Sequence, residues 1–252
     1  MTLSPLGPIA PREPAHQACE HALRAAILDG GLAAGSRLPP ERDLATTLGV
    51  SRLTLRAALA TLTAQGLVAV RHGSGYVVQD VRRTGGPDLL AGLTSLAQTR
   101  GELPAIATEL LRVRRQLARG VLEHLVEHPP RPPSVRGFVA AVDAMDAVVH
   151  DRPADLPAIA AADLAVVRAL LEATRGPVLR LCLNPVIGVV DACPPLRAAM
   201  YLTPIDNVTG WRALAAWLAT PSVATIDAAI AILAERDRAT IARLRRRGPR
   251  SP

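Results

Sequence analysis

Apolar residues recur at helical spacing in the first third of the chain and predict three short helices. The first covers residues 16–28 and ends at Asp29-Gly30-Gly31, because glycine readily adopts a left-handed backbone at a helix C-terminus. Pro39-Pro40 predicts the entry of a second helix, which stops at Leu48-Gly49-Val50. A third helix starts at Ser51, a favourable N-cap residue, and runs to Gly66.

The hydrophobic pattern changes from helical to strand-like after Gly66. The segment LVAVRHGSGYVVQD alternates apolar and polar residues on both sides of a His-Gly-Ser-Gly turn, and it therefore predicts a β-hairpin. Two short helices joined by a tight turn that contains glycine are typical of a helix-turn-helix motif. With the hairpin as its wing, this region predicts a winged helix-turn-helix.

The rest of the chain continues with helical periodicity and contains no convincing strand. Breaks that contain proline separate helices expected at 104–128, 134–149, 155–174, 177–191, 207–219 and 223–247. The expected fold is mainly α: an N-terminal winged helix-turn-helix with a small β-hairpin wing, then a C-terminal antiparallel α-helical bundle. The expected division is a flexible leader at 1–14, the winged domain at 15–80, a linker and first helix at 81–102, the helical domain at 103–247 and a tail at 248–252.

Charge and cysteine content change this picture little. The net charge is +7, yet residues 1–80 carry seven Arg against six acidic residues, whereas residues 236–252 carry seven Arg against one Asp. The basic excess is thus mostly C-terminal and is more typical of a solvated helix end than of a DNA-binding arm. Three widely spaced cysteines, no secretory leader and no apolar run of about 18 residues predict a cytoplasmic protein without membrane contact.

Polar residues at the start of the third helix predict the DNA contacts. In a helix-turn-helix this helix lies in the major groove, where its N-terminal residues meet the base edges. Arg52 can bind a guanine through two hydrogen bonds, and Arg56, one turn later, can reach a base or a phosphate. Arg42 is expected to hold phosphate, and the wing tip is expected to enter the minor groove. The complete set is Arg42, Ser51, Arg52, Leu53, Thr54, Arg56, His72 and Gly73.

The stretch RLPPERDLATTLGVSRLTLRAALATLTAQGLVAVRHGSGYVV resembles the GntR family of bacterial regulators, over about 60 residues when the first helix is included. The resemblance implies a homodimer that binds a double-stranded DNA operator, with contacts at the positions just named. Leu53 departs from the family, because many members have threonine or another polar residue there. A hydrogen bond is then lost, although Leu53 can touch a thymine methyl group instead.

The second half is similar to the FadR group of that family in the segments ELLRVRRQLARGVLEHL and AADLAVVRALLEATRGPVLRL. Many members of the group bind Zn²⁺ or a similar metal through an Asp, a His four residues later, and two further His. This chain retains Asp163 but has Val167 at the first His position, while Trp211 and Arg236 align near the other two. Because one carboxylate cannot hold a transition metal alone, we expect no metal and no cofactor.

This loss resembles the branch of the group whose sensor binds acyl-CoA without a metal. The resemblance implies a small-molecule effector, an acyl-CoA or another lipid-like carboxylate derivative, near Arg114, Asp163, Val167 and Trp211. Arg114 is expected either to meet an anionic ligand group or to form an ion pair within the domain. Trp211 and Trp217 are expected to pack in the core or at a dimer interface.

Two alternatives stay open at this point. The first is a regulator that responds to a small organic acid and keeps residual metal binding through Asp163. The second is a metal-dependent hydrolase, because His124-Leu-Val-Glu127-His128 has the H-x-x-E-H spacing that chelates a metal on a helix. Pro129 ends that helix at once, and no third ligand is evident. The sequence therefore favours a ligand-responsive regulator of transcription over an enzyme.

Overall fold

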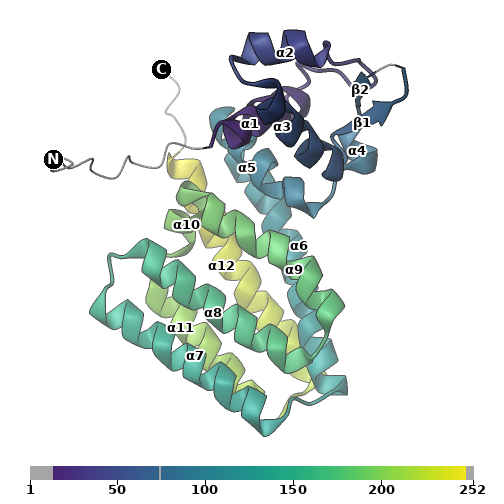
Figure 1. The fold of residues 1–252 in the computed structure, drawn as a ribbon. Coiled ribbons are helices and arrows are strands. Elements are labelled where there is room, and N and C mark those ends of the chain that lie inside the picture. Colours follow the sequence, from purple (N-terminus) through teal and green to yellow (C-terminus); the bar gives the residue numbers. More distant parts are fainter. Residues whose placement is uncertain (1–13, 74, 248–252) are drawn as a thin grey trace, which may run out of the picture. The chain divides into compact units, whose positions relative to one another are not determined.

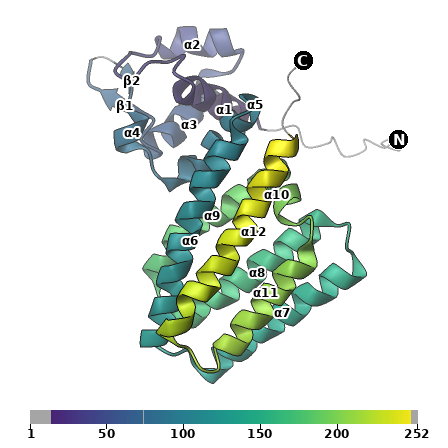
Figure 2. The same cartoon turned by 180° about the vertical axis from the view of Figure 1, so that it is seen from behind.

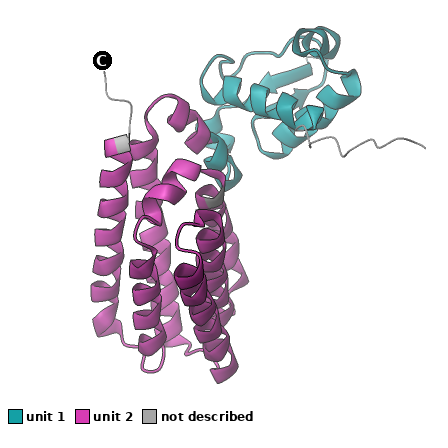
Figure 3. Ribbon diagram, turned by 90° about the vertical axis from the view of Figure 1, so that its left-hand side faces the viewer, with its two compact units in different colours: residues 1–92 teal, residues 93–252 magenta. Residues whose placement is uncertain are grey.

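A computed structural model describes residues 14–73 and 75–247 of the chain. The tail expected at 248–252 lies outside these residues, and so does the expected leader apart from Pro14. The chain divides into two compact units, residues 1–92 and 93–252 (Figure 3). Each unit has its own core and is described separately below.

The first unit contains a helix-turn-helix followed by a hairpin, as predicted (Figure 1). Its elements are α1 (Ala15–Leu28), α2 (Glu41–Leu48), α3 (Arg52–Ala64), β1 (Val68–Arg71), β2 (Gly75–Val78), α4 (Val81–Thr84), the 3-10 turn η1 (Pro87–Leu89) and the start of α5 (Leu90–Thr99). Gly49 ends α2 with a left-handed backbone, φ 64°, which glycine adopts at little cost. The strands pair antiparallel, with Val68 opposite Val78.

One face of α3 forms the centre of this unit's core. Leu55, Ala58, Leu59 and Leu62 follow helical spacing and are all 0% exposed. They pack in one cluster with apolar residues of α1 and with the hairpin. Burying a leucine completely stabilises a fold by about 1.5–3 kcal/mol, so this row holds α3 against the unit while its opposite face stays in solvent.

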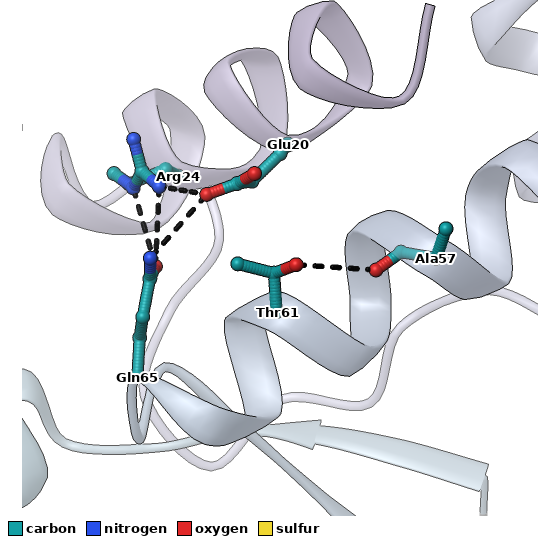
Figure 4. A network of polar contacts seen from close by, with 5 residues as sticks. All are labelled: Glu20, Arg24, Ala57, Thr61 and Gln65. Carbon is teal, nitrogen blue, oxygen red and sulfur yellow. Dashed lines mark hydrogen bonds and ion pairs between the residues drawn. The ribbon is translucent and has the colours of Figure 1, made fainter.

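A polar network fixes the C-terminal end of α3 to α1 (Figure 4). Gln65 accepts hydrogen bonds from Arg24 at 3.4 Å (Nε) and 3.2 Å (Nη2), and it donates to Glu20 Oε1 at 3.3 Å. Arg24 and Glu20 also form an ion pair along α1. Because all three groups are partly buried and satisfy one another, α3 is anchored at its C-terminal end, and its N-terminal end is left for other contacts.

The second unit is a bundle of helices, as predicted. It contains most of α5, then α6 (Leu103–Glu127), α7 (Pro132–Asp151), α8 (Leu156–Thr174), α9 (Pro177–Ala192), α10 (Pro194–Met200), α11 (Pro204–Trp217), the 3-10 turn η2 (Val223–Thr225) and α12 (Ile226–Arg247). Although they are far apart in sequence, α6 and α12 lie side by side (Figures 1 and 2). Helix α7 packs against α8 and α11.

Some helix boundaries differ from the prediction because prolines begin helices here as well as separating them. Pro194-Pro195 was expected to be only a break, but these residues form the first turn of α10, where the amides need no intrahelical partner. For the same reason α11 begins at Pro204 rather than at residue 207, and it ends at Trp217. The helix expected from residue 223 begins as the turn η2.

Within the part of the chain that the structure describes, no single helix is both long and apolar enough to cross a membrane. The pair α9 and α10, bent by 96° at the break between them, passes that test only when the two helices are taken together.

Candidate functional site

The N-terminal end of α3 is held in shape by a side-chain cap. Ser51 Oγ accepts a hydrogen bond from the Thr54 amide at 3.0 Å and lies 2.8 Å from Thr54 Oγ1. The cap satisfies one of the amides that have no partner in the first turn of a helix. Ser51 and Thr54, both predicted DNA contacts, therefore have a structural task in addition to any contact with DNA.

The predicted arginines lie on the exposed surface of α2 and α3. Arg52 and Leu53 occupy the first turn of α3, and the Leu53 side chain is 80% exposed. Arg56 Nε lies 3.7 Å from Glu41 Oε2, and Arg42 Nε lies 3.5 Å from Asp43 Oδ1. Exposed ion pairs of this kind contribute about 0–1 kcal/mol, so these guanidinium groups can exchange their partners for phosphates at little cost.

The wing tip has a backbone that requires glycine. Gly73 and Gly75 have φ values of 71° and 72°, so a side chain at either position would be strained. His72 is exposed next to Gly73. Arg71 is also exposed and lies opposite Gly75 in the strand register, where it is a further cation that the sequence analysis missed. The RHGSG turn sequence was the signal that could have identified it.

A cavity of about 390 Å³ lies inside the helical unit, where α6, α8, α9, α11 and α12 contribute its walls. This volume falls in the range of about 300–1,000 Å³ that is usual for small-molecule sites. All four predicted effector residues, Arg114, Asp163, Val167 and Trp211, line the cavity. Most of the remaining lining is aliphatic, which makes the interior apolar with a few polar groups.

Asp163 lies at the centre of the polar part of the cavity and is only 8% exposed. Its Oδ2 accepts a hydrogen bond from the Tyr201 hydroxyl at 2.8 Å, and its Oδ1 accepts one from Trp211 Nε1 at 2.6 Å. The Trp211 ring meets Phe138 edge-on, with 6.1 Å between ring centroids. Both carboxylate oxygens thus have donors that burial and packing hold in place.

Burial, together with the negative charge of Asp163, raises the pKa of Tyr201 well above its ordinary value of 10.0. The unfolded chain therefore loses this phenolic proton first as the pH rises above about 10, and unfolding becomes more favourable. We expect the free energy of unfolding of the wild type to fall by an extra ~1.4 kcal/mol per pH unit there, relative to Tyr201→Phe. Urea denaturation followed by circular dichroism between pH 8 and pH 11 measures this difference. Tyr76→Phe, the matched control, should keep the fall, and equal slopes in the wild type and Tyr201→Phe would contradict the assignment.

The other charged residues at the cavity come from α6, α11 and α12. Asp237 accepts from both Arg114 and Arg115, so Arg114 forms the intradomain ion pair that the sequence analysis gave as its alternative to a ligand contact. Arg236 also lines the cavity, and burial lowers its pKa. The sequence singled out Arg236 only as the residue near a lost metal ligand, and it gave no signal for Tyr201.

The residues around Asp163 do not fit a metal ion. Both oxygens of the only carboxylate that the group's metal pattern retains accept hydrogen bonds from neutral donors, and a permanently charged guanidinium lines the same cavity. Among the described residues no group of three or more His, Cys, Asp or Glu side chains could hold a metal. The residual metal site proposed at Asp163 therefore has no ligand set in this structure.

The H-x-x-E-H segment on α6 is occupied by structural contacts. His124 Nε2 hydrogen-bonds the Thr174 carbonyl at 2.9 Å, and its ring stacks on His128 with 4.6 Å between centroids. Within residues 14–73 and 75–247, no group of three or more His, Cys, Asp or Glu side chains that could hold a metal includes these histidines. The hydrolase alternative thus gains no support from the geometry.

Comparison with known proteins assigns the first unit clearly. The family described as "Bacterial regulatory proteins, gntR family" matches residues 16–78, from α1 to β2. An uncharacterized HTH-type transcriptional regulator of Mycobacterium tuberculosis is 40% identical over 157 residues, which are 62% of this chain and 60% of that protein. A "Fatty acid metabolism regulator protein" of Edwardsiella ictaluri is 34% identical over 156 residues, with the same two coverages. The matched segments span about 60% of the length of these relatives.

A solved structure covers more of the fold. The Listeria monocytogenes protein Lar, described as controlling expression of the agr system, superposes with a TM-score of 0.59 at 17% sequence identity and covers 94% of this chain and 100% of its own. This likeness concerns the fold alone. The family and the relatives are transcriptional regulators, not enzymes. The sequence resemblance is confirmed over the first unit, where residues 16–78 match the gntR family of bacterial regulatory proteins.

Proposed function

We propose that this protein is a homodimeric transcription regulator that acts in the cytoplasm, binds an operator through α3 and the wing, and responds to a lipid-like ligand in the cavity of its helical unit. The observation that carries the proposal is the exposed arginine surface on the capped N-terminal end of α3, in a domain of the gntR family. The regulatory role of the relatives supports the same function.

The chemistry of the α3 surface supports operator recognition. Arg52 and Leu53 occupy the turn that meets base edges in helix-turn-helix proteins, and an arginine fork matches guanine O6 and N7. Arg42 and Arg56, with their weak exposed ion pairs, supply charge for phosphates. His72 and Gly73 at the wing tip are proposed to contact the minor groove.

A dimer is proposed because one recognition helix reads only a few base pairs. Two copies related by a two-fold axis read two half-sites, spaced by about one helical turn or a multiple of it, and so reach the affinity that regulation needs. The cavity supports the effector, because it combines a large apolar lining with a small polar cluster around Asp163. The name of the Edwardsiella relative points to fatty acid metabolism, so the proposed effector is a fatty acyl-CoA or a related lipid metabolite.

Selection from a random pool of duplex DNA with the full chain tests the regulatory role. We expect enrichment of inverted repeats whose half-site centres lie about 10 base pairs apart, or a multiple of that spacing. Light scattering of the protein should give twice the 26.5 kDa of one chain. A pool that enriches no motif at physiological salt would refute the DNA-binding function, and a monomer on the selected site would refute the dimer.

A further inference from the structure

The chain that follows the hairpin packs closely on the end of α3. Residues 81–92 belong to the first compact unit, and Leu89, which is 2% exposed, is part of that unit's core. Thr84 Oγ1 donates a hydrogen bond to the Gly66 carbonyl at 2.7 Å, just after the end of α3. A Cβ atom on Gly66 would lie 2.5 Å from the Thr84 carbonyl oxygen, closer than such contacts occur. The segment 81–92 is therefore fitted to the C-terminal end of the recognition helix.

A second close contact joins α5 to α1. A Cβ atom added to Gly92 of α5 would lie 2.9 Å from Arg24 Cδ and 3.2 Å from Leu28 Cδ1. The two helices approach this closely because residue 92 has no side chain. The Arg24 side chain cannot move aside freely, because it is only 16% exposed and its guanidinium is bonded to Glu20 and Gln65 (Figure 4).

Arg24 therefore connects three elements of the first unit. Its aliphatic stem contacts α5, its guanidinium pairs with Glu20 on α1, and its Nε and Nη2 donate to Gln65 at the C-cap of α3. Helix α3 has 13 residues and is thus about 20 Å long. A rotation of the helix about its held end moves the first turn, at the other end, by the largest distance.

We propose that Arg24 is a positioning residue for operator recognition. Contact with Gly92 of α5 holds the Arg24 side chain on Gln65, and Gln65 in turn fixes the direction of α3. Arg24 acts without touching DNA, because it lies at the end of α3 opposite to Arg52. Helix α5 continues past Gly92 into the second unit, so the direction of α3 depends on the position of α5. This inference rests on the proposed function and deepens its DNA-binding part.

A role in stability alone makes a different prediction. Loss of a purely stabilising contact lowers the melting temperature, and a variant that is still fully folded then binds the operator as the wild type does. Loss of a positioning contact leaves α3 folded but in several orientations. The apparent affinity for the operator then falls in proportion to the fraction of molecules with the competent orientation. Binding to a scrambled duplex changes little, because phosphate contacts supply most of it.

The variant Gly92→Ala tests the proposal without changing Arg24 itself. Alanine favours an α-helix over glycine, so the variant should fold, and the added methyl group displaces the Arg24 side chain from Gln65. By fluorescence anisotropy we expect operator affinity to fall at least about fivefold and affinity for the scrambled duplex to stay within about twofold. Gly137→Ala on α7 is the matched control, because a Cβ atom there meets nothing within 4 Å. Wild-type operator affinity in Gly92→Ala would overturn the proposal.

A double-mutant cycle tests whether Gly92 acts through Arg24. Arg24→Met keeps an apolar stem and removes the guanidinium, so it should weaken operator binding by a similar factor. Adding Gly92→Ala to Arg24→Met should have little further effect, because both changes remove the same contact. Arg24→Lys retains a cation and a donor and should bind the operator more tightly than Arg24→Met. Additive losses in the double variant, or equal affinities of the methionine and lysine variants, would contradict the assignment.

Hydrogen exchange without DNA separates this inference from the function on which it rests. The backbone amides of residues 61–65, in the last turn of α3, should exchange faster in Gly92→Ala than in the wild type, and Gly137→Ala should keep the wild-type rates. Unchanged rates in Gly92→Ala would overturn the positioning role even if an operator is found. A duplex pool that yields no operator would instead refute the DNA-binding function, and the exchange rates alone would then decide whether Arg24 holds α3.

Discussion

Replacing Arg52 with alanine is expected to weaken binding to the selected operator by at least about 30-fold while the protein stays folded. Each bidentate contact of an arginine with guanine contributes about 1–3 kcal/mol of discrimination, and a dimer loses one contact in each half-site. The side chain is exposed on the first turn of α3, and the cap from Ser51 to the Thr54 amide does not involve it. The loss should therefore appear in binding and not in the melting temperature.

Fluorescence anisotropy with the selected duplex, and with a duplex of scrambled half-sites, measures this effect. The scrambled duplex should bind both proteins almost equally, because phosphate contacts supply most of the non-specific affinity. Arg238→Ala, which removes an exposed arginine from the helical unit, is the matched control and should bind the operator as the wild type does. If Arg52→Ala retained wild-type operator affinity, α3 would not be the element that reads the bases.

Replacing Asp163 with alanine is expected to lower the free energy of unfolding by about 2–5 kcal/mol. The change leaves the Tyr201 hydroxyl and the Trp211 indole N–H without their acceptor, and each buried polar group without a partner costs about 1–3 kcal/mol. It also removes the nearby negative charge that stabilises Arg236. Burying the Asp163 carboxylate is itself unfavourable in the wild type, and the alanine variant no longer has this cost. The expected loss of stability is therefore smaller than the sum of the contributions just given.

Chemical denaturation of three variants separates these contributions. Asp163→Asn keeps one acceptor oxygen and should lie between the wild type and Asp163→Ala. The double variant Asp163→Ala/Tyr201→Phe removes the orphaned hydroxyl and should recover part of the lost stability relative to Asp163→Ala. An Asp163→Ala protein as stable as the wild type would show that the carboxylate does not organise the cavity. A loss that a chelator reproduces in the wild type would instead indicate a structural metal.

Asp163 also shows which features of the cavity the sequence did not predict. The helical pattern placed Asp163 on a helix, and the family resemblance marked it as a former metal ligand with Val167 at the lost His position. Its present partners come from 38 and 48 residues away in the sequence, and no local pattern connects them. Arg114 is similar, because its ion pair with Asp237 spans 123 residues and the sequence left its role open between ligand and ion pair.

The sequence predicted the elements whose position depends on interactions within a few residues. Gly49, Ser51 and the alternation after Gly66 placed the helix-turn-helix and the hairpin, because caps, turns and periodicity act within a few residues. The same reasoning failed at Pro194 and Pro204, where a proline ends one element and begins the next. Proline restricts the backbone before it and suits the first turn after it, so the residue alone does not show which effect decides.

The sequence by itself determined the helical periodicity and the winged helix-turn-helix with its exposed arginines, since each depends on residue type at short spacing. Only the tertiary structure decided which polar groups in the helical unit satisfy one another. It placed the Tyr201 hydroxyl and the Trp211 indole on Asp163, and it gave Arg114 its partner Asp237. The physical reason is that the partner of a buried charge is set by helix packing across the bundle, which no short segment encodes.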